Sequence, residues 1–149
     1  MVCPKCHAAK SRIYNSRPTK RTNQTWRRRR CTNCGFTFST REYIEADQCL
    51  TVVTKNSTQP FSRVTLLLSL AQACSHYTDK PDIAFYLLGT IETKLLEKSQ
   101  EGQISSEDII ATTLSVLQNF DTKAYLRYLA TYPTIQDPRD LKKLLSKKP

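Results

Sequence analysis

The C-terminal two thirds of the chain carry apolar residues at the spacing of an α-helix. The most regular row recurs every four positions, so it would form one buried face of a helix that starts after Pro81. Its members are Ile83, Leu87, Ile91 and Leu95. We expect this helix to end at Glu101–Gly102, because glycine commonly follows the last helical turn.

A second helix is predicted before this row and a third after it. Val64–Cys74 is apolar on most sides, which favours a buried helix with Ser62 as its N-cap. Further on, Ser105 or Ser106 would cap a helix whose first turn is acidic. The apolar stripe of this third helix is Ile109, Ile110, Thr113, Leu114 and Leu117.

The end of the chain predicts two shorter helices. One begins near Asp121 and closes before Pro133. The other would start at Asp137–Pro138, where aspartate can cap a helix and proline fits its first turn. The first of the two carries Tyr125, Tyr128 and Leu129. By composition alone, the cluster of Tyr125, Tyr128 and Tyr132 is ordinary core packing.

Alternation with a period of two predicts strands instead. Phe36 and Phe38 alternate with polar residues, and short strands are also expected at 12–16 and from residue 25 into the arginine run. The polar stretch Pro18–Gln24 would form the loop of a hairpin. Residues 44–50 form a junction, after which Leu50–Thr54 predicts a strand and Lys55–Ser57 a turn. The fold class is therefore α+β, with a small β module before a mostly helical part that has a β-hairpin at its front.

Four cysteines stand in two identical C-x-x-C frames, Cys3/Cys6 and Cys31/Cys34. Two such frames complete the closed four-thiolate site that is typical of structural zinc, with one Zn²⁺ per chain. Redox-active thiols or a disulfide pair are the alternatives. The segment has few apolar residues, so the bound ion would supply much of its folding free energy. We therefore expect residues 1–46 to form a zinc ribbon.

Positive charge is concentrated on the same segment. The 149-residue chain has a net charge of +10, and residues 1–46 hold eleven basic and only two acidic residues, a net charge of +9. This asymmetry indicates a polyanionic partner, most simply nucleic acid, although a solvated basic surface is the alternative.

Arginines dominate this charge. Four of them precede Cys31, and alternate side chains of a strand face opposite sides, so two of the four would contact any one ligand. Trp26, beside them, is assigned to hydrophobic anchoring in preference to base stacking. The candidate DNA-binding residues are Arg17, Arg27, Arg28, Arg29, Arg30 and Arg41.

Several features argue against other classes of protein. The chain has no stretch long and apolar enough to span a membrane and no signal peptide, and with a reduced thiolate site this predicts a cytoplasmic protein. Cys49 and Cys74 lie in apolar contexts and are expected to be buried free thiols. The sequence contains no Gly-rich phosphate loop, and its two histidines have no catalytic neighbours, so we expect no enzymatic activity.

A second candidate site lies at the front of the helical part. Val52, Val53 and Lys55 followed by Pro60 and Phe61 have the layout of a hairpin laid over a helix N-terminus. A lysine and backbone N–H groups could hold a phosphate there.

These motifs, in this order, resemble the NrdR-type bacterial repressors of ribonucleotide reductase genes. The matching segments include Asn15-Ser16-Arg17, the arginine run, Phe38–Glu42 and Val52-Val53 with Pro60-Phe61. A last one, Ala124–Tyr132 followed by Gln136-Asp137, lies near the C-terminus. The resemblance covers almost the whole chain.

The resemblance implies a zinc ribbon followed by an ATP-cone domain. The ribbon would bind paired operator boxes in double-stranded promoter DNA. The cone would bind ATP or dATP and change the state of a homo-oligomer. The implied domains are 1–46 for the ribbon, 47–138 for the ATP-cone and 139–149 for a helical tail. The implied nucleotide-binding residues are Val52, Val53, Lys55, Pro60, Phe61, Tyr125 and Tyr128.

The chain departs from the family in the cone. Thr54 and Thr65 stand where the family carries lysines, with Lys55 one position after Thr54. A second reading is therefore a DNA-binding zinc ribbon whose degenerate cone serves only oligomerisation or partner binding. A third makes the C-x-x-C pairs redox-active in an oxidoreductase.

Overall fold

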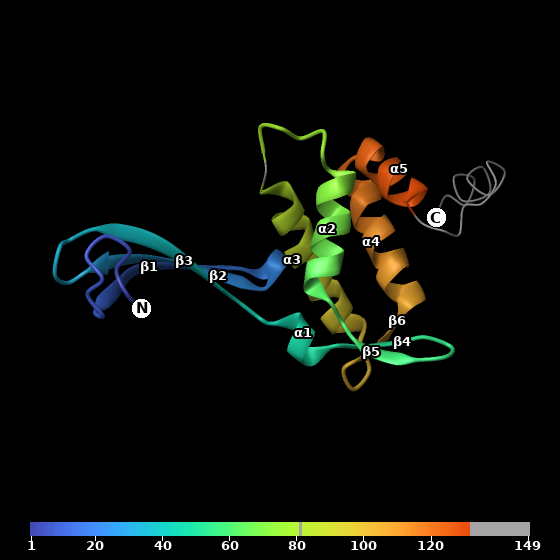
Figure 1. Ribbon diagram of the computed structural model, residues 1–149, viewed down its shortest axis with the longest axis horizontal. Helices are drawn as coiled ribbons and strands as arrows, with labels where there is room; N and C mark the ends of the chain where they lie inside the picture. The colour runs from blue at the N-terminus through green and yellow to red at the C-terminus, as the bar shows by residue number, and fades with distance from the viewer. Residues whose placement is uncertain (81, 132–149) are drawn as a thin grey trace.

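The computed structural model describes residues 1–80 and 82–131 and shows an α+β fold, as predicted. A three-stranded β ribbon forms one end of the molecule, and a helical part with a second small sheet forms the other (Figure 1). The two sheets have the strand orders β1-β2-β3 and β5-β4-β6.

The ribbon is an antiparallel meander. Its strands are longer than predicted because the hairpin loop is short: a single 3-10 turn, η1, replaces most of the expected loop. The register slips between Ile13 and Asn15, where a bulge leaves Tyr14 without a partner on β2. The elements are β1 (Ser11–Thr19), η1 (Lys20–Thr22), β2 (Gln24–Cys31) and β3 (Thr37–Tyr43).

Four helices make up the bulk of the second part. They are α2 (Arg63–Ala73), α3 (Ile83–Lys98), α4 (Ser106–Phe120) and α5 (Thr122–Ala130). Three begin with a side-chain cap: Ser62 accepts from the Thr65 N–H, Ser105 from Asp108 and Asp121 from Ala124. The predicted caps are confirmed, with Ser105 as the cap of α4.

The second sheet contains one strand that the sequence did not predict. The hairpin β4 (Thr51–Val53) and β5 (Thr58–Pro60) is antiparallel, and β6 (Gln103–Ser105) joins β4 in parallel. The end predicted for α3 was therefore wrong: α3 stops at Lys98, and Glu101–Gly102 forms the turn into β6. Gly102 has φ +75°, and a Cβ there would lie 2.7 Å from the carbonyl oxygen of Cys49, so glycine is required.

The core of the helical part forms where α2, α3, α4 and α5 meet. Leu87, Ile91 and Leu95 from the predicted row are buried, and Ile83 packs at its edge. The junction expected at 44–50 is ordered rather than irregular: it contains a one-turn helix, α1 (Ala46–Cys49), whose Ala46 is fully buried. The junction is thus part of the helical core.

Two expectations about burial were wrong in part. On α2, Val64 and Leu68 are 63% and 64% exposed, because only the opposite face packs against the other helices. Cys49 is exposed, whereas Cys74 is buried as predicted. Trp26 is half-buried, and its role as the hydrophobic anchor of the ribbon stays a prediction. The helix expected at Asp137–Pro138 and the tail 139–149 lie outside the described residues.

The ribbon contacts the helical part through the tip of its β1–β2 hairpin and the end of β3. Gly89 of α3 leaves room for this contact, since a Cβ there would lie 2.6 Å from Gln24 Nε2 and 3.1 Å from Thr22 Cβ. Arg41 Nη2 donates to the Tyr86 hydroxyl over 3.0 Å. Three elements of the ribbon therefore meet α3 at one place.

Candidate functional site

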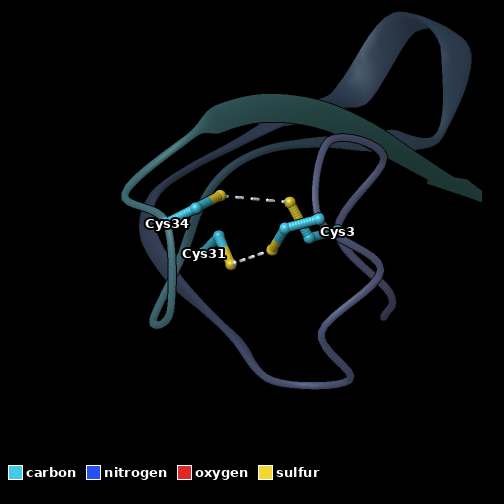
Figure 2. Close-up of side chains that lie close together, drawn as sticks. Cys3, Cys31 and Cys34 are labelled. Carbon is cyan, nitrogen blue, oxygen red and sulfur yellow. Dashed lines mark hydrogen bonds between the residues drawn. The ribbon is translucent and has the colours of Figure 1, made fainter.

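The structure brings the four cysteines of the C-x-x-C frames together. All four Sγ atoms lie within 4.8 Å of one another. The Sγ atoms of Cys3 and Cys34 are 3.7 Å apart (Figure 2). The Sγ atoms of Cys6 and Cys31 are 3.6 Å apart. Sulfur atoms around a tetrahedral zinc ion with Zn–S bonds of about 2.3 Å are separated by about 3.8 Å. The donor set and its spacing therefore fit Zn²⁺.

The two halves of this cluster are built by the same local geometry. The backbone N–H of His7 donates to the Cys3 carbonyl, and that of Gly35 donates to the Cys31 carbonyl. Both residues have left-handed backbones, with φ 57° for His7 and 70° for Gly35. Each directly follows the second cysteine of its frame, so both turns close in the same way. Glycine adopts this conformation freely, whereas histidine does so at a cost.

Backbone N–H groups also point at the sulfurs. The N–H of Lys5 lies 3.4 Å from Cys3 Sγ, and the N–H of Asn33 lies 3.4 Å from Cys31 Sγ. The Asn33 amide also approaches Cys6 Sγ at 3.8 Å. Such donors stabilise thiolate, which is the form that ligates a metal.

The acid–base properties of the thiols are consistent with a metal site. The pKa of Cys6 falls to about 6, first through the backbone N–H of Ala8 and then through Cys34. At Cys34 the backbone N–H of Phe36 lowers the pKa, but desolvation and the neighbouring thiols raise it to about 11. Four adjacent thiolates repel one another, so a divalent cation is what allows all of them to ionise.

The strand register separates the arginines onto two faces of the ribbon. Trp26 lies opposite Arg17 on one side and Arg41 on the other, and Arg30 lies opposite Arg12. Residues paired across strands share a face, as do alternate residues along one strand. One face therefore gathers a set that we call the basic face: Arg12, Arg17, Arg28, Arg30 and Arg41, around Trp26. Arg12 was missed by the sequence analysis, because its place depends on the register beyond the bulge.

The basic face retains its positive charge. Within residues 1–80 and 82–131 none of its five arginines forms an ion pair. Arg28 Nε donates to the uncharged Tyr14 hydroxyl at 3.1 Å, and the Arg17 guanidinium lies 6.0 Å from the Trp26 ring centroid. Neither contact neutralises a guanidinium.

The other two arginines of the run lie on the opposite face and are engaged there. Arg27 Nη2 forms an ion pair with Glu42 at 2.5 Å. Arg29 Nε donates to Thr40 Oγ1 at 3.1 Å. The six candidate DNA-binding residues thus divide into four on the basic face and two behind it.

A cavity of about 540 Å³ lies along α2, between the β4–β5 hairpin and helices α4 and α5. Four of the candidate nucleotide-binding residues line it: Val52, Pro60, Phe61 and Tyr128. The other three do not. Val53 lines a separate cleft, Lys55 is exposed in the hairpin turn and Tyr125 is buried in the core.

The sequence analysis missed the polar lining of this cavity. One row of it comes from a single face of α2 and the residue before that helix: Ser62, Thr65, Ser69 and Gln72. Their spacing of three or four residues is that of one helix face. This periodicity is present in the sequence. The apolar residues between its members are more numerous, however, and they favoured a helix that is buried on most sides.

In the part of the chain that the structure describes, no helix is long and apolar enough to cross a bilayer.

Comparison with known proteins links both halves of the molecule to one family. Residues 1–42 match the family model described as the transcriptional repressor NrdR-like N-terminal domain. Curated proteins named transcriptional repressor NrdR from Staphylococcus aureus strains JH9, Newman and JH1 are 31% identical over 140 residues. That similarity spans 92% of this chain and 87% of each relative.

These relatives are named as regulators, so the prediction that the chain is not an enzyme is confirmed at the level of the family. The family-model match covers the cysteine cluster, and the similarity to the relatives spans most of the chain. The chain therefore belongs to the NrdR family of zinc-ribbon transcriptional repressors.

Proposed function

We propose that this protein represses ribonucleotide reductase genes by binding their double-stranded promoter DNA through the basic face of the zinc ribbon. In this proposal it acts in the cytoplasm as a homo-oligomer, and ATP or dATP in the cavity modulates DNA binding. The ribbon comprises residues 1–46, the ATP-cone-like domain residues 47–138 and the tail residues 139–149.

The observation that carries the DNA-binding proposal is the division of the arginines by the strand register. Arg17, Arg28, Arg30 and Arg41 lie on one face without carboxylate partners, whereas Arg27 is neutralised by Glu42 on the other. Guanidinium groups bind phosphate bidentately and can also read the guanine edge. A ribbon of β-strands can enter the major groove.

Zinc would support the basic face by stabilising the fold of the ribbon. We assign Cys3, Cys6, Cys31 and Cys34 as the ligands, which connect the start of the chain to the end of β2 and the start of β3. Arg30 belongs to β2 immediately before Cys31, and its Nη2 would lie 3.7 Å from a Cβ on Gly35. The ion would therefore hold the end of the basic face in place.

The effector proposal rests on the cavity. Its volume falls within the usual range for small-molecule sites, roughly 300–1,000 Å³, and Phe61 and Tyr128 provide a buried aromatic lining. Val52 and Pro60 of the hairpin close one side. An occupant would contact α2, whose first residue, Arg63, packs on Tyr43 at the end of the ribbon.

One observation supports a second candidate function, in which the helical part serves only assembly. Val64 and Leu68 present an apolar strip on the exposed face of α2, and they are one helical turn apart. In this case DNA binding would be insensitive to nucleotides.

The decisive experiment is a fluorescence-anisotropy titration of the zinc-loaded protein against reductase-promoter duplexes and scrambled duplexes, with ATP, dATP or neither. Promoter-selective binding that changes with nucleotide supports the whole proposal. Selective binding that ignores both nucleotides supports the second candidate. Equal binding to promoter and scrambled duplexes would contradict repression through this promoter.

A further inference from the structure

We propose that a pocket between the tip of the ribbon and helix α3 holds a backbone phosphate of the bound DNA, so that the DNA contact continues from the basic face onto the helical part. This proposal rests on the proposed binding of DNA by the basic face. It follows from the cations around the pocket, from the path of α3 across the end of the ribbon and from the exposure of the site.

Both parts of the molecule build this pocket, which has a volume of about 340 Å³. The 3-10 turn η1 at the tip of the ribbon hairpin contributes Lys20 and Arg21. Helix α3 contributes Lys94 and Glu97, and α4 contributes Asn119. We call this site, defined by these five residues, the tip pocket. An occupant of the tip pocket contacts the ribbon and the helical core at the same time.

Helix α3 crosses the end of the ribbon from β3 to η1. Near the start of α3 the Tyr86 hydroxyl accepts a hydrogen bond from Arg41, a member of the basic face. Gly89 then lies against the hairpin tip, and Lys94 lies further along, where α3 meets η1 in the tip pocket. The basic face therefore reaches α3 at one edge of the ribbon, and the tip pocket lies at the other edge.

The tip pocket is also close to the basic face along the chain. Arg17 of the basic face precedes Lys20 by three residues, which span at most about 10 Å of extended chain. Double-stranded DNA carries one negative charge per ~1.7 Å of its axis. A duplex that covers Arg17 therefore presents further phosphates within reach of the tip pocket.

Positive charge is in excess around the tip pocket. Lys20, Arg21 and Lys94 are cationic, and Glu97 is the acidic residue that the structure describes in the lining. None of the ion pairs formed within residues 1–80 and 82–131 involves these four side chains. An arginine fork binds phosphate through two parallel hydrogen bonds, and a lysine binds it as a point charge.

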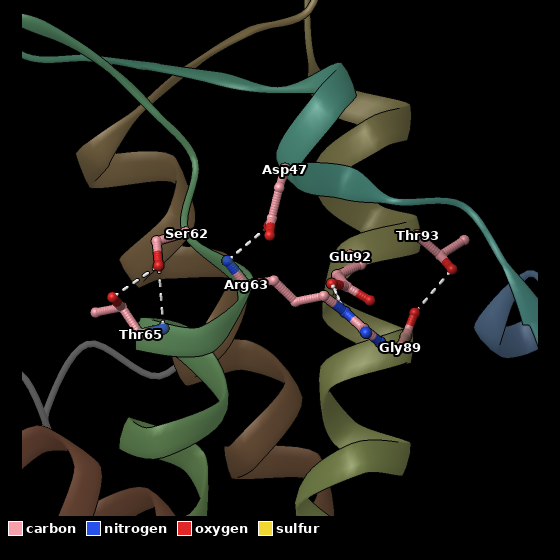
Figure 3. Close-up of polar contacts among 7 residues, drawn as sticks. All are labelled: Asp47, Ser62, Arg63, Thr65, Gly89, Glu92 and Thr93. Carbon is pink, nitrogen blue, oxygen red and sulfur yellow. Dashed lines mark hydrogen bonds and ion pairs between the residues drawn. The ribbon is translucent and has the colours of Figure 1, made fainter.

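Neutral groups of the lining are largely committed to the backbone. Thr93 Oγ1 donates to the Gly89 carbonyl over 2.8 Å (Figure 3). Thr90 Oγ1 likewise donates to the Tyr86 carbonyl over 3.0 Å. The Asn119 amide uses one N–H on a carbonyl of its own helix and keeps the second for a ligand. Binding therefore depends mainly on the three cations, which suits a phosphate contact that carries no sequence information.

The exposure of the cations favours DNA over a free anion. Lys20, Arg21 and Lys94 are all exposed, so water and salt screen their attraction for a small anion from solution. A duplex already held by the basic face presents its phosphates at a high effective concentration. The tip pocket would thus add to the affinity of a duplex that is bound elsewhere.

Anisotropy titrations of the zinc-loaded full chain at several salt concentrations, with promoter and scrambled duplexes, test the proposal. We expect Lys94→Ala to weaken binding of both duplexes about fivefold and to reduce the slope of log affinity against log salt by ~0.9, the value for one phosphate. Lys123→Ala removes the same charge from an exposed position on α5 and is the matched control. We expect it to bind as the wild type does. Equal slopes for the two variants would overturn the proposal.

A second comparison tests whether the ribbon and α3 hold the same phosphate. Lys20→Ala with Arg21→Ala should reproduce the effect of Lys94→Ala. The variant that combines all three substitutions should lose less affinity than the product of the two separate losses, because both sets of side chains act on one phosphate. Losses that multiply would assign Lys94 and η1 to different phosphates and would overturn the shared site.

The measurements separate this proposal from the proposed function. Selectivity between promoter and scrambled duplexes tests repression, whereas the salt slope tests the tip pocket. Selective binding with a wild-type slope in Lys94→Ala would leave repression intact and overturn the tip pocket. The same holds if inorganic pyrophosphate shifts the NMR amide signal of Lys94 while the variants bind DNA as the wild type does, because the pocket would then take a free anion. If the wild type binds neither duplex, both proposals fail.

Discussion

At the scale of single residues, the arginine run shows how strand register assigns different roles to identical side chains. Arg28 and Arg30 belong to the basic face, whereas Arg27 and Arg29 bond to Glu42 and Thr40 behind it. The sequence predicted that two of the four would face one ligand. It did not predict which two would join Arg17 and Arg41, because that depends on the pairing of β2 with β1 and β3, which places Trp26 opposite both Arg17 and Arg41.

This division leads to a paired mutational test. We expect Arg28→Ala with Arg30→Ala to weaken DNA binding and to reduce the slope of log affinity against log salt by ~0.9 for each phosphate that is no longer neutralised. Arg27→Ala with Arg29→Ala is the matched control, with the same change in charge, and it should alter the slope less. Anisotropy titrations at several salt concentrations measure both. A larger effect of the control pair would place DNA on the other face.

Asp121 provides a residue-level prediction about acid stability. Its carboxylate caps α5, and the backbone N–H of Ala124, followed by that of Lys123 and by His76, holds its pKa below the ordinary value. A lowered pKa in the folded state contributes stability above the unfolded pKa, and this stability is lost as pH falls through the folded value.

We therefore expect Asp121→Ala to cost about 1 kcal/mol at neutral pH and to flatten the loss of stability in acid. Urea denaturation between neutral and acidic pH measures both effects. Asp121→Asn keeps a capping oxygen without the charge, so it should retain most of the neutral-pH stability. If both variants lose stability at acidic pH in the same way as the wild type, Asp121 is not the group whose protonation destabilises the protein in acid.

At the scale of elements, the sequence predicted those helices and strands that are defined by contacts between residues close in the chain, and it missed those defined by distant pairing. Helices α3, α4 and α5 were predicted because caps and i, i+4 spacing are local signals. The three-residue strand β6 was missed because it is defined by its parallel pairing with β4, about fifty residues earlier. The cysteine cluster was predicted from spacing alone, whereas the cavity required the packing of α2 against a distant hairpin.

The ribbon is the element whose order should depend most on metal. We expect Cys31→Ser, or removal of zinc by a chelator, to unfold the strands of the ribbon and abolish DNA binding while the helical core stays folded, because the binding energy of the ion is folding energy for this segment. NMR amide spectra distinguish the two parts. Cys49→Ser, at an exposed thiol outside the cluster, is the matched control. Retained promoter binding in Cys31→Ser would refute the structural role of the metal.

At the scale of the whole molecule, the contact between the two parts depends on a residue without a side chain. Gly89 lies in the middle of α3 where Thr22 and Gln24 approach. Alanine is favoured over glycine inside a helix by roughly 0.5–1 kcal/mol. Its Cβ would nevertheless press on Thr22, so the same substitution acts in opposite directions on the helix and on the contact.

We expect Gly89→Ala to raise the melting temperature of the helical part slightly and to loosen the ribbon from it. Small-angle X-ray scattering and NMR relaxation of the ribbon amides report the loosening. Thr90→Ala, at the next residue, is a control within the same helix. If the ribbon tumbles with the helical part in Gly89→Ala as in the wild type, the close approach is not what joins them.

The concentration of charge at one end has a further physical consequence. The ribbon carries a net charge of +9 and the remainder of the chain only +1, and the ribbon extends from the helical part along the long axis (Figure 1). The molecule is therefore a strong electric dipole. In the field of any polyanion it experiences a torque that turns the ribbon toward the surface before contact is made, so encounters are oriented in advance and become slower as salt screens the field.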